Sequence, residues 1–427
     1  ALLYEVDLMI TEGIAVTTQP TKKSYYIGEA FDPAGMVVTA TFADDTTEDV
    51  TDDCTFSPAT ISKDTTAITV NYQRGGIKKT ASVAVTVRVL ASIEISNPPT
   101  KTAYKYGEVF SPAGMAVTAR YTDGQSRTVT GYTYSPAGAL AAGNTTITVS
   151  YTEGGVTKTT TQAITVTTIN TTLNSNSWAT IKAVSDAGKG DSYWDVGDTK
   201  TITINGTVQG FTFSSLSIAV FILGFNHNSN REGSSRIHFQ IGKISNKLVG
   251  LCDNSYGSYV SSGFCMNTSR TNSGGWNGSY MRKTVLGNSG TPSSPPANTL
   301  LAALPADLRA VMKSVTKYSD NTGGGSDNAG YVTATTDYLF LLAEFEYHGS
   351  RSYANSAEQN YQKQYDYYKA GNSKVHYRHD STGTAVLAWT RSAYSGNSNS
   401  FCLVYTDGTP NNGDAAGSWA LAPGFAA

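Results

Sequence analysis

Apolar and polar residues alternate at every second position through much of the first half of the chain. Residues 37–42 and 81–87 show this pattern, which is typical of strands with one buried face. Turn signals separate the runs, including Asp44–Asp45, Asp123–Gly124 and two Gly–Gly pairs. Short strands at this spacing predict small all-β sandwiches of about 80 residues each.

The alternating pattern occurs twice. The segment 33–36, Pro-Ala-Gly-Met, recurs at 112–115, and Ile-Thr-Val at 68–70 recurs at 147–149, in the same order and at the same offset. We therefore predict two homologous domains, residues 1–89 and 90–168. Both resemble bacterial Ig-like domains, which occur in tandem on surface proteins and phage virions. Neither repeat has the Cys…Trp…Cys pattern of antibody domains, so no core disulfide is expected.

Residues 167–177 form a polar linker, after which the pattern changes to mixed helices and strands. Apolar residues at helical spacing predict helices over 178–188, 276–286, 300–315 and 357–369. Ser177 is the expected N-cap of the first helix, and Pro305 is expected to start a second helix within 300–315. Strands are expected at 200–204, 218–225, 385–389, 401–405 and 419–422. This mixture predicts an α+β domain over residues 177–427.

Near the C-terminus, apolar framework positions alternate with small polar residues and Tyr. Trp389, Arg391, Phe401, Val404 and Gly408 have the character of framework, and Asn, Ser and Tyr lie between them. That composition is typical of an antibody-like contact surface and not of a catalytic cleft. An ordinary loop rich in turn-forming residues would have a similar composition.

The frame Trp389-Thr390-Arg391-Ser392, with Asp407-Gly408 and Pro423-Gly424-Phe425, resembles the last strands of the C-type-lectin-like fold. It is most similar to variable proteins of diversity-generating retroelements from gut phages and bacteria. Other marks of the resemblance are Ser177–Trp178, residues 193–197, Gly275–Trp276 and Leu304–Pro305. The resemblance implies a multidomain protein, with two Ig-like sandwiches followed by a C-type-lectin-like ligand-binding domain.

The resemblance also implies which residues contact a ligand. Trp389, Phe401, Leu403 and Val404 are expected to be buried. The residues expected to project outward are Leu387, Ala388, Thr390, Tyr394, Ser395, Gly396, Asn397, Ser398, Asn399, Ser400, Tyr405, Asn411, Asn412, Asp414, Ser418 and Trp419. In the diversified relatives, mutation at adenines makes such positions variable.

Composition narrows the classes of partner. Charged residues make up 15% of the 427 residues and the net charge is −2, which argues against nucleic acid as a partner. No apolar run approaches the roughly 20 residues of a membrane-spanning helix. Four cysteines are too few for a disulfide scaffold; Cys252 and Cys265 are either a bridge or buried free thiols, and Cys402 is expected to pack as a small apolar residue.

Two groups of side chains have the residue types of a metal or catalytic site. His376, His379 and Asp380 could ligate zinc, but no Cys or further His lies nearby in sequence to complete a ligand set. Glu344 and Glu346, at alternate positions of a predicted strand, are either a hydrolytic pair or carboxylates that are solvated or paired with Arg. The calcium tripeptides of sugar-binding lectins and the cysteine pair of formylglycine-generating oxidases, which share the lectin fold, are missing.

These patterns together predict a protein that is not an enzyme and needs no cofactor or metal. It is expected to be displayed on a virion, in association with the tail, or on a cell surface, where it binds a protein or glycan of a host or target cell. A monomer is the favoured state. The alternatives are a bacterial surface adhesin without diversification and a glycan hydrolase that uses Glu344 and Glu346.

Overall fold

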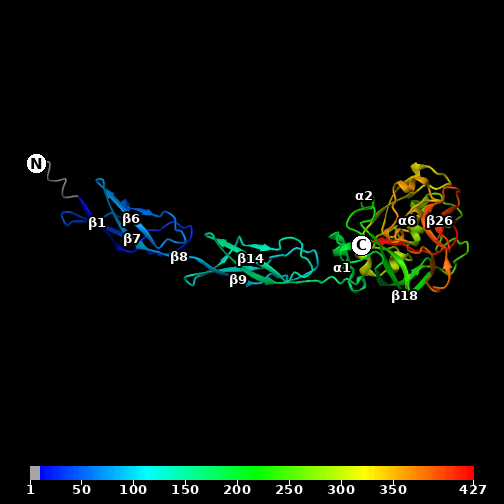
Figure 1. The fold of residues 1–427 in the computed structure, drawn as a ribbon, viewed down its shortest axis with the longest axis horizontal. Helices are drawn as coiled ribbons and strands as arrows, with labels where there is room; N and C mark the ends of the chain where they lie inside the picture. Colours follow the sequence, from blue (N-terminus) through cyan, green and yellow to red (C-terminus); the bar gives the residue numbers. More distant parts are fainter. Residues whose placement is uncertain (1–9) are drawn as a thin grey trace. The chain divides into compact units, whose positions relative to one another are not determined.

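The computed structural model describes residues 10–427 and divides into two compact units (Figure 1). Among the described residues, the first contains 10–104 together with 108–166, and the second contains 105–107 and 167–427. The first unit has two separate apolar cores, whereas one large cluster dominates the second.

The first core belongs to a sandwich of short strands. Two three-stranded sheets, in the orders β1-β3-β4 and β5-β6-β7, are accompanied by β2 and β8, which pair in parallel. Alternate residues such as Val38, Val70 and Val83 point between the sheets and are fully buried. The strands are β1 (Thr11–Thr18), β2 (Ser24–Tyr26), β3 (Val37–Phe42), β4 (Thr47–Asp49), β5 (Thr55–Ser57), β6 (Ala67–Arg74), β7 (Ile77–Ala84) and β8 (Thr86–Arg88).

The second sandwich repeats this topology. Its sheets have the orders β12-β11-β9 and β13-β14-β15, and β10 pairs in parallel with β16. The strands are β9 (Leu90–Asn97), β10 (Ala103–Tyr104), β11 (Ala116–Tyr121), β12 (Ser126–Val129), β13 (Thr133–Ser135), β14 (Thr146–Glu153), β15 (Val156–Ala163) and β16 (Thr165–Val166).

The sequence repeat extends to side-chain contacts. The hydroxyl of Tyr25 donates to the carbonyl of Lys22 at 2.9 Å, and Tyr104 donates to Lys101 at 2.8 Å. Both tyrosines are buried within their sandwiches. The predicted pair of all-β domains is therefore confirmed.

The predicted first helix of the second unit is confirmed. Helix α1 (Trp178–Asp186) begins where the hydroxyl of Ser177 accepts a hydrogen bond from the amide of Thr180 at 3.1 Å. Gly188 follows the helix in the left-handed region, at φ = +66°.

A seven-stranded sheet forms the framework of the second unit. It has the order β17-β18-β19-β20-β23-β24, and β28 also pairs with β19. Its strands are β17 (Thr199–Val208), β18 (Phe211–Phe225), β19 (Ile237–Ile244), β20 (Lys247–Gly250), β23 (His376–Arg378), β24 (Ala385–Val386) and β28 (Gly424–Ala426). The strands expected at 200–204 and 218–225 lie inside β17 and β18.

The remaining helices are short, and several predicted helices are broken. Ser279 is extended (ψ = 144°) and separates α3 (Gly275–Gly278) from a π-helical turn, Met281–Val285. Pro305 separates α4 (Leu300–Ala303) from α5 (Ala306–Arg309), as expected, but Val315 begins β21 (Val315–Asp320) and not a helical turn. The other α-helices are α2 (Ser229–Glu232), α6 (Glu344–His348) and α7 (Asp366–Lys369).

The helix predicted over 357–369 is wrong. This segment holds a 3-10 turn, Ser356–Asn360, then extended backbone, then α7. Further 3-10 turns are Thr51–Asp53, Leu173–Ser175, Gly190–Ser192 and Ala329–Tyr331.

The last third of the chain adds two small antiparallel sheets. One pairs β21 with β22 (Val332–Asp337), and the other has the order β25 (Ala388–Ala393), β26 (Ser400–Val404), β27 (Pro410–Asp414). Residues 419–422 make isolated bridges at Ala420 and Leu421 in place of the expected strand.

Candidate functional site

The sheet formed by β25, β26 and β27 has a buried framework. Trp389 is opposite Leu403, and Ala393 is opposite Phe401. Trp389, Phe401, Leu403 and Val404 are all buried, as predicted. The indole of Trp389 donates to the carbonyl of Phe264 at 3.1 Å, which anchors β25 to the preceding part of the domain.

Four residues predicted to project outward are buried instead. They are Ala388, Thr390, Ser400 and Ser418. Ala388 packs with Cys252 and Ala420, and Ser400 donates to the Asn399 side chain. The Thr390 hydroxyl donates to the carbonyl of Cys402, and the Ser418 hydroxyl donates to Asp253 at 2.7 Å. These hydroxyls satisfy interior hydrogen bonds, so their small polar side chains do not signal a contact surface.

The other predicted residues keep part of their surface accessible, and we call this set the C-terminal surface. It comprises Leu387, Tyr394, Ser395, Gly396, Asn397, Ser398, Asn399, Tyr405, Asn411, Asn412, Asp414 and Trp419. Tyr405 is the most exposed large side chain among them, at 41%. Asn411, Asn412 and Asp414 lie on β27, which is the edge strand of its sheet.

One buried side chain holds the loop between β25 and β26. The side-chain nitrogen of Asn272 donates to the backbone carbonyls of Tyr394, Asn397 and Ser400 at 2.8–3.1 Å. Asn272 is fully buried, so this clamp is shielded from water. The backbone of the loop is fixed while its side chains remain accessible.

A second segment, residues 253–263, lies beside the C-terminal surface. Tyr259 forms an isolated antiparallel β-bridge with Gly417. On either side of it, the backbone amides of Gly257 and Val260 donate to the carbonyls of Ser418 and Ala416, respectively. Tyr259 is 66% exposed, the largest exposed fraction among the large apolar side chains of the described residues.

Arg270 connects Tyr259 to the C-terminal surface. Its guanidinium lies 5.1 Å from the centroid of the Tyr259 ring and pairs with the carboxylate of Asp414. Neither Tyr259 nor Arg270 is predicted from the sequence, because both lie about 150 residues before the surface they adjoin.

Trp419 is packed more tightly than predicted. Its ring meets Tyr256 edge to face, at 5.5 Å between centroids. A Cβ at Gly417 would lie 2.5 Å from the indole nitrogen, so glycine at this position makes room for the ring. Trp419 therefore contributes to the wall of the surface more than to its free contact area.

A buried ionic cluster lies on the inner side of β25. Arg391, fully buried, contacts both carboxylate oxygens of Glu346 and donates to Ser319 Oγ at 2.8 Å and to the carbonyl of Leu341 at 2.9 Å. The bidentate pairing compensates the buried charges of Arg391 and Glu346, and the additional acceptors bind the remaining N–H groups of the guanidinium.

Lys317 completes this cluster. Its ammonium donates to Glu232 at 2.7 Å, to Tyr365 at 2.9 Å and to Glu346 at 3.0 Å. His227, Glu232 and Glu346 have ligand atoms within 4.8 Å of one another, a spacing that fits a metal ion. However, the ammonium of Lys317 already bridges the carboxylates of Glu232 and Glu346. The protein's own lysine therefore supplies the positive charge that these carboxylates require.

Burial shifts the pKa of several groups in and near the cluster. It lowers the pKa of His227 to about 3 and raises the pKa of Glu232 to about 7. The pKa of Glu346 falls well below its ordinary range because the positive charges of Arg391 and Lys317 outweigh the desolvation. These shifts are those of a structural charge network.

The predicted strand containing Glu344 and Glu346 is wrong. Both residues lie in α6, and each is saturated by a different set of donors. Glu344 accepts the backbone amides of residues 352–354, whereas Glu346 accepts Arg391 and Lys317. The alternative, a carboxylate paired with Arg, is correct for Glu346.

The residues of the proposed zinc motif do not converge. His376 lies 3.4 Å from the hydroxyl of Tyr347, while Nδ1 of His379 accepts the amide of Cys252 at 3.2 Å. Asp380 pairs with Arg378 at the surface. All four cysteines are free, and Cys402 is buried as predicted.

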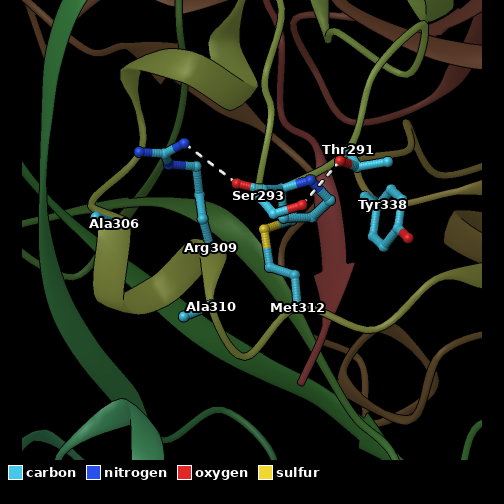
Figure 2. A pocket seen from close by; sticks show the side chains of 8 residues that line it. Thr291, Ser293, Ala306, Arg309, Ala310, Met312 and Tyr338 are labelled. Atoms are coloured by element: carbon cyan, nitrogen blue, oxygen red, sulfur yellow. Dashed lines mark hydrogen bonds between the residues drawn. The ribbon is translucent and has the colours of Figure 1, made fainter.

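Figure 2 shows a hollow elsewhere in the domain, lined by residues of 291–293, 306–312 and Tyr338, with a volume of about 480 Å³. Its one charged side chain, Arg309, donates to the carbonyls of Leu304 and Pro292. None of its lining residues belongs to the C-terminal surface.

Three segments of the chain match known domain families. Residues 18–87 and 97–167 each match the bacterial Ig-like domain (group 3), and residues 259–426 match a domain of unknown function, DUF6273. Tandem domains of the Ig-like kind indicate a surface or binding protein. Within the described residues, every helix is too short or too polar to span a membrane.

One curated relative is pectate lyase L of Thermoclostridium stercorarium, 31% identical over 125 residues. The match covers 26% of this chain and 10% of the relative. The chain thus spans about a tenth of the length of the curated relative it matches.

Proposed function

We propose that the second unit is a C-type-lectin-like head that binds a protein or glycan of a host or target cell. Its contacts are made by the C-terminal surface together with Tyr259 and Arg270. The Ig-like domains act as spacers on a virion tail or a cell surface. Binding needs no turnover, cofactor or metal.

The observation that carries this proposal is the clamp at Asn272. It fixes the backbone of residues 394–400 while Asn, Ser and Tyr side chains stay accessible. A pre-organised backbone reduces the entropy lost on binding, and Tyr and Asn supply stacking area and adaptable hydrogen bonds. The exposed ring of Tyr259 extends the same surface.

Binding of the purified chain to intact cells of a bacterial panel and to a glycan array tests the proposal. We expect Tyr259→Ala and Tyr405→Ala each to weaken capture by about tenfold, since a contact aromatic contributes on the order of 1–2 kcal/mol. Val109→Ala, at a 54% exposed position of the second Ig-like domain, is the matched control. Capture that is unchanged in both tyrosine variants would contradict the proposal.

We further propose that the accessible positions vary between members of a natural population. Deep sequencing of codons 385–420 is expected to show adenine substitutions at Tyr394, Asn397, Tyr405 and Asn412, among others of the C-terminal surface. The four buried positions named above should remain constant. A uniform segment would leave the alternative, a surface adhesin without diversification.

The pectate lyase relative raises the possibility of an enzyme. The saturated carboxylates of Glu344 and Glu346 argue against the hydrolase considered from the sequence, since each already accepts several donors. Turnover of pectate by the purified chain would overturn the proposal of binding alone.

A further inference from the structure

A polar hollow of about 590 Å³ lies between the end of β18, α6 and α7. Its volume is within the range of small-molecule sites. The lining residues are Phe225, Asn226, His227, Asn228, Phe345, Gly349, Gln362, Lys363, Gln364, Asp366 and Lys369. None of them belongs to the C-terminal surface.

The walls combine two aromatic rings with several amides. Phe225 and Phe345 are half-buried, so part of each ring remains accessible. The Asn226 carboxamide oxygen accepts the amide of Arg236, and the Gln364 nitrogen donates to the carbonyl of Tyr347. Each amide is thereby oriented and keeps its other polar atom for a ligand.

Two of the lining residues are buried and carry a polar atom without a hydrogen-bond partner among the described residues. They are Nε2 of His227, which lies 3.9 Å from a carboxylate oxygen of Glu232, and Oε1 of Gln362; both residues are 5% exposed. A buried polar atom left unpaired costs about 1–3 kcal/mol and calls for an explanation. A ligand hydroxyl that reaches Oε1 of Gln362 would supply its missing hydrogen bond.

Two asparagines that line the hollow lie on a tight turn. Asn226 and Asn228 both adopt the left-handed conformation, at φ = +48° and +46°. Asn tolerates this conformation better than most residues, so the turn can hold both side chains beside the hollow. The side chains of Lys363, Lys369 and Asp366 are exposed at the rim and give it a net positive charge.

We propose that this hollow binds an acidic sugar residue. The ammonium groups of Lys363 and Lys369 pair with the sugar carboxylate, and the amides and Asp366 bind its hydroxyls. The rings of Phe225 and Phe345 pack against its C–H faces. The site does not depend on the ligand of the C-terminal surface.

Titration of the full chain with glucuronate and with glucose, followed by ligand-observed NMR and calorimetry, tests this proposal. The two probes share a ring and differ in the carboxylate. We expect glucuronate to bind and glucose to bind at least fivefold more weakly. Absence of glucuronate binding, or equal affinity for the two probes, would overturn the proposal.

Lys363→Met and Lys369→Met should each weaken glucuronate binding at least threefold without changing the melting temperature. Lys283→Met is the matched control, because Lys283 is also exposed but does not line the hollow. Tyr259→Ala should leave glucuronate binding unchanged, which distinguishes this site from the C-terminal surface. Glucuronate affinity that is unaltered in both lysine variants would contradict the assignment.

Discussion

Arg391 and Glu346 form a bidentate ion pair, and both side chains are completely buried. The pair joins β25, which leads into the C-terminal surface, to α6. Arg391 was predicted from the sequence to be a framework residue. Its buried ion pair with Glu346 explains that role, because the pair holds β25 against α6.

Arg391→Met is expected to destabilise the second unit by about 3–5 kcal/mol, because Glu346 would keep only Lys317 as a charged partner. Denaturant unfolding of the full chain, followed by the signal of the second unit, measures the loss. Arg378→Met is the control; its ion pair with Asp380 is partly exposed and should contribute less than about 1 kcal/mol. Equal losses in the two variants would contradict a structural role for the buried pair.

Stability should fall as the pH is lowered below about 6.5. Burial lowers the pKa of His227 and His376 to about 3, that of His348 to about 4 and that of His238 well below its ordinary value. Below about pH 6.5 these histidines are therefore protonated in the unfolded chain but stay neutral in the folded chain, which favours unfolding. Glu232 and Glu358, with pKa values raised to about 7, act in the opposite direction, but two acids do not offset four histidines.

The net effect is a loss of roughly 1–3 kcal/mol per pH unit between about pH 6 and 5. Thermal unfolding at a series of pH values measures this slope. His376→Gln should reduce it by about 1.4 kcal/mol per pH unit, since one proton is removed from the balance. A slope that is unchanged in this variant would show that His376 titrates normally in the folded chain.

Gly114→Ala is expected to destabilise the second Ig-like domain by about 1–2 kcal/mol. Gly114 adopts φ = +80°, and a Cβ there would lie 2.8 Å from the methyl carbon of Thr100. Gly138→Ala, in the same domain, meets nothing within 4 Å and should be neutral. Calorimetry compares the two variants, and equal melting temperatures would refute the expected strain.

The chain should retain four free thiols under oxidising conditions. Burial raises the pKa of Cys252 and Cys265 to about 12, so both should react slowly with alkylating reagents until the protein unfolds. Thiol titration in denaturant should detect all four, and reducing agent should not change the melting temperature. Detection of only two thiols would indicate a disulfide.

The sandwiches could be predicted because their information is local and repeated. Alternation, turn residues and the recurrence of Pro-Ala-Gly-Met each point to the same fold. Helix α1 was predictable for a similar reason, since Ser177 caps it through a contact three residues away.

The interior of the second unit could not be predicted in the same way. Alternating polarity around Glu344 and Glu346 indicated a strand, yet both carboxylates are buried, because a following backbone turn satisfies Glu344 and the distant side chains of Arg391 and Lys317 satisfy Glu346. Likewise, Thr390 and Ser418 resemble contact residues by type, but Cys402 and Asp253 hold their hydroxyls inside. The pairing of Tyr259 with Gly417 could not be predicted from the residues around either position, because backbone pairing between distant segments depends on the whole fold.

The clamp at Asn272 separates the parts of the chain that carry stability from the parts that are free to change. Its three hydrogen bonds go to backbone carbonyls, which every amino acid supplies, so replacing the side chains of Ser395 and of residues 397–399 leaves it formed. A combinatorial library randomised at the accessible polar positions of this loop and of β27 should therefore lose few members to misfolding. The domain would then serve as a scaffold from which new affinities can be selected.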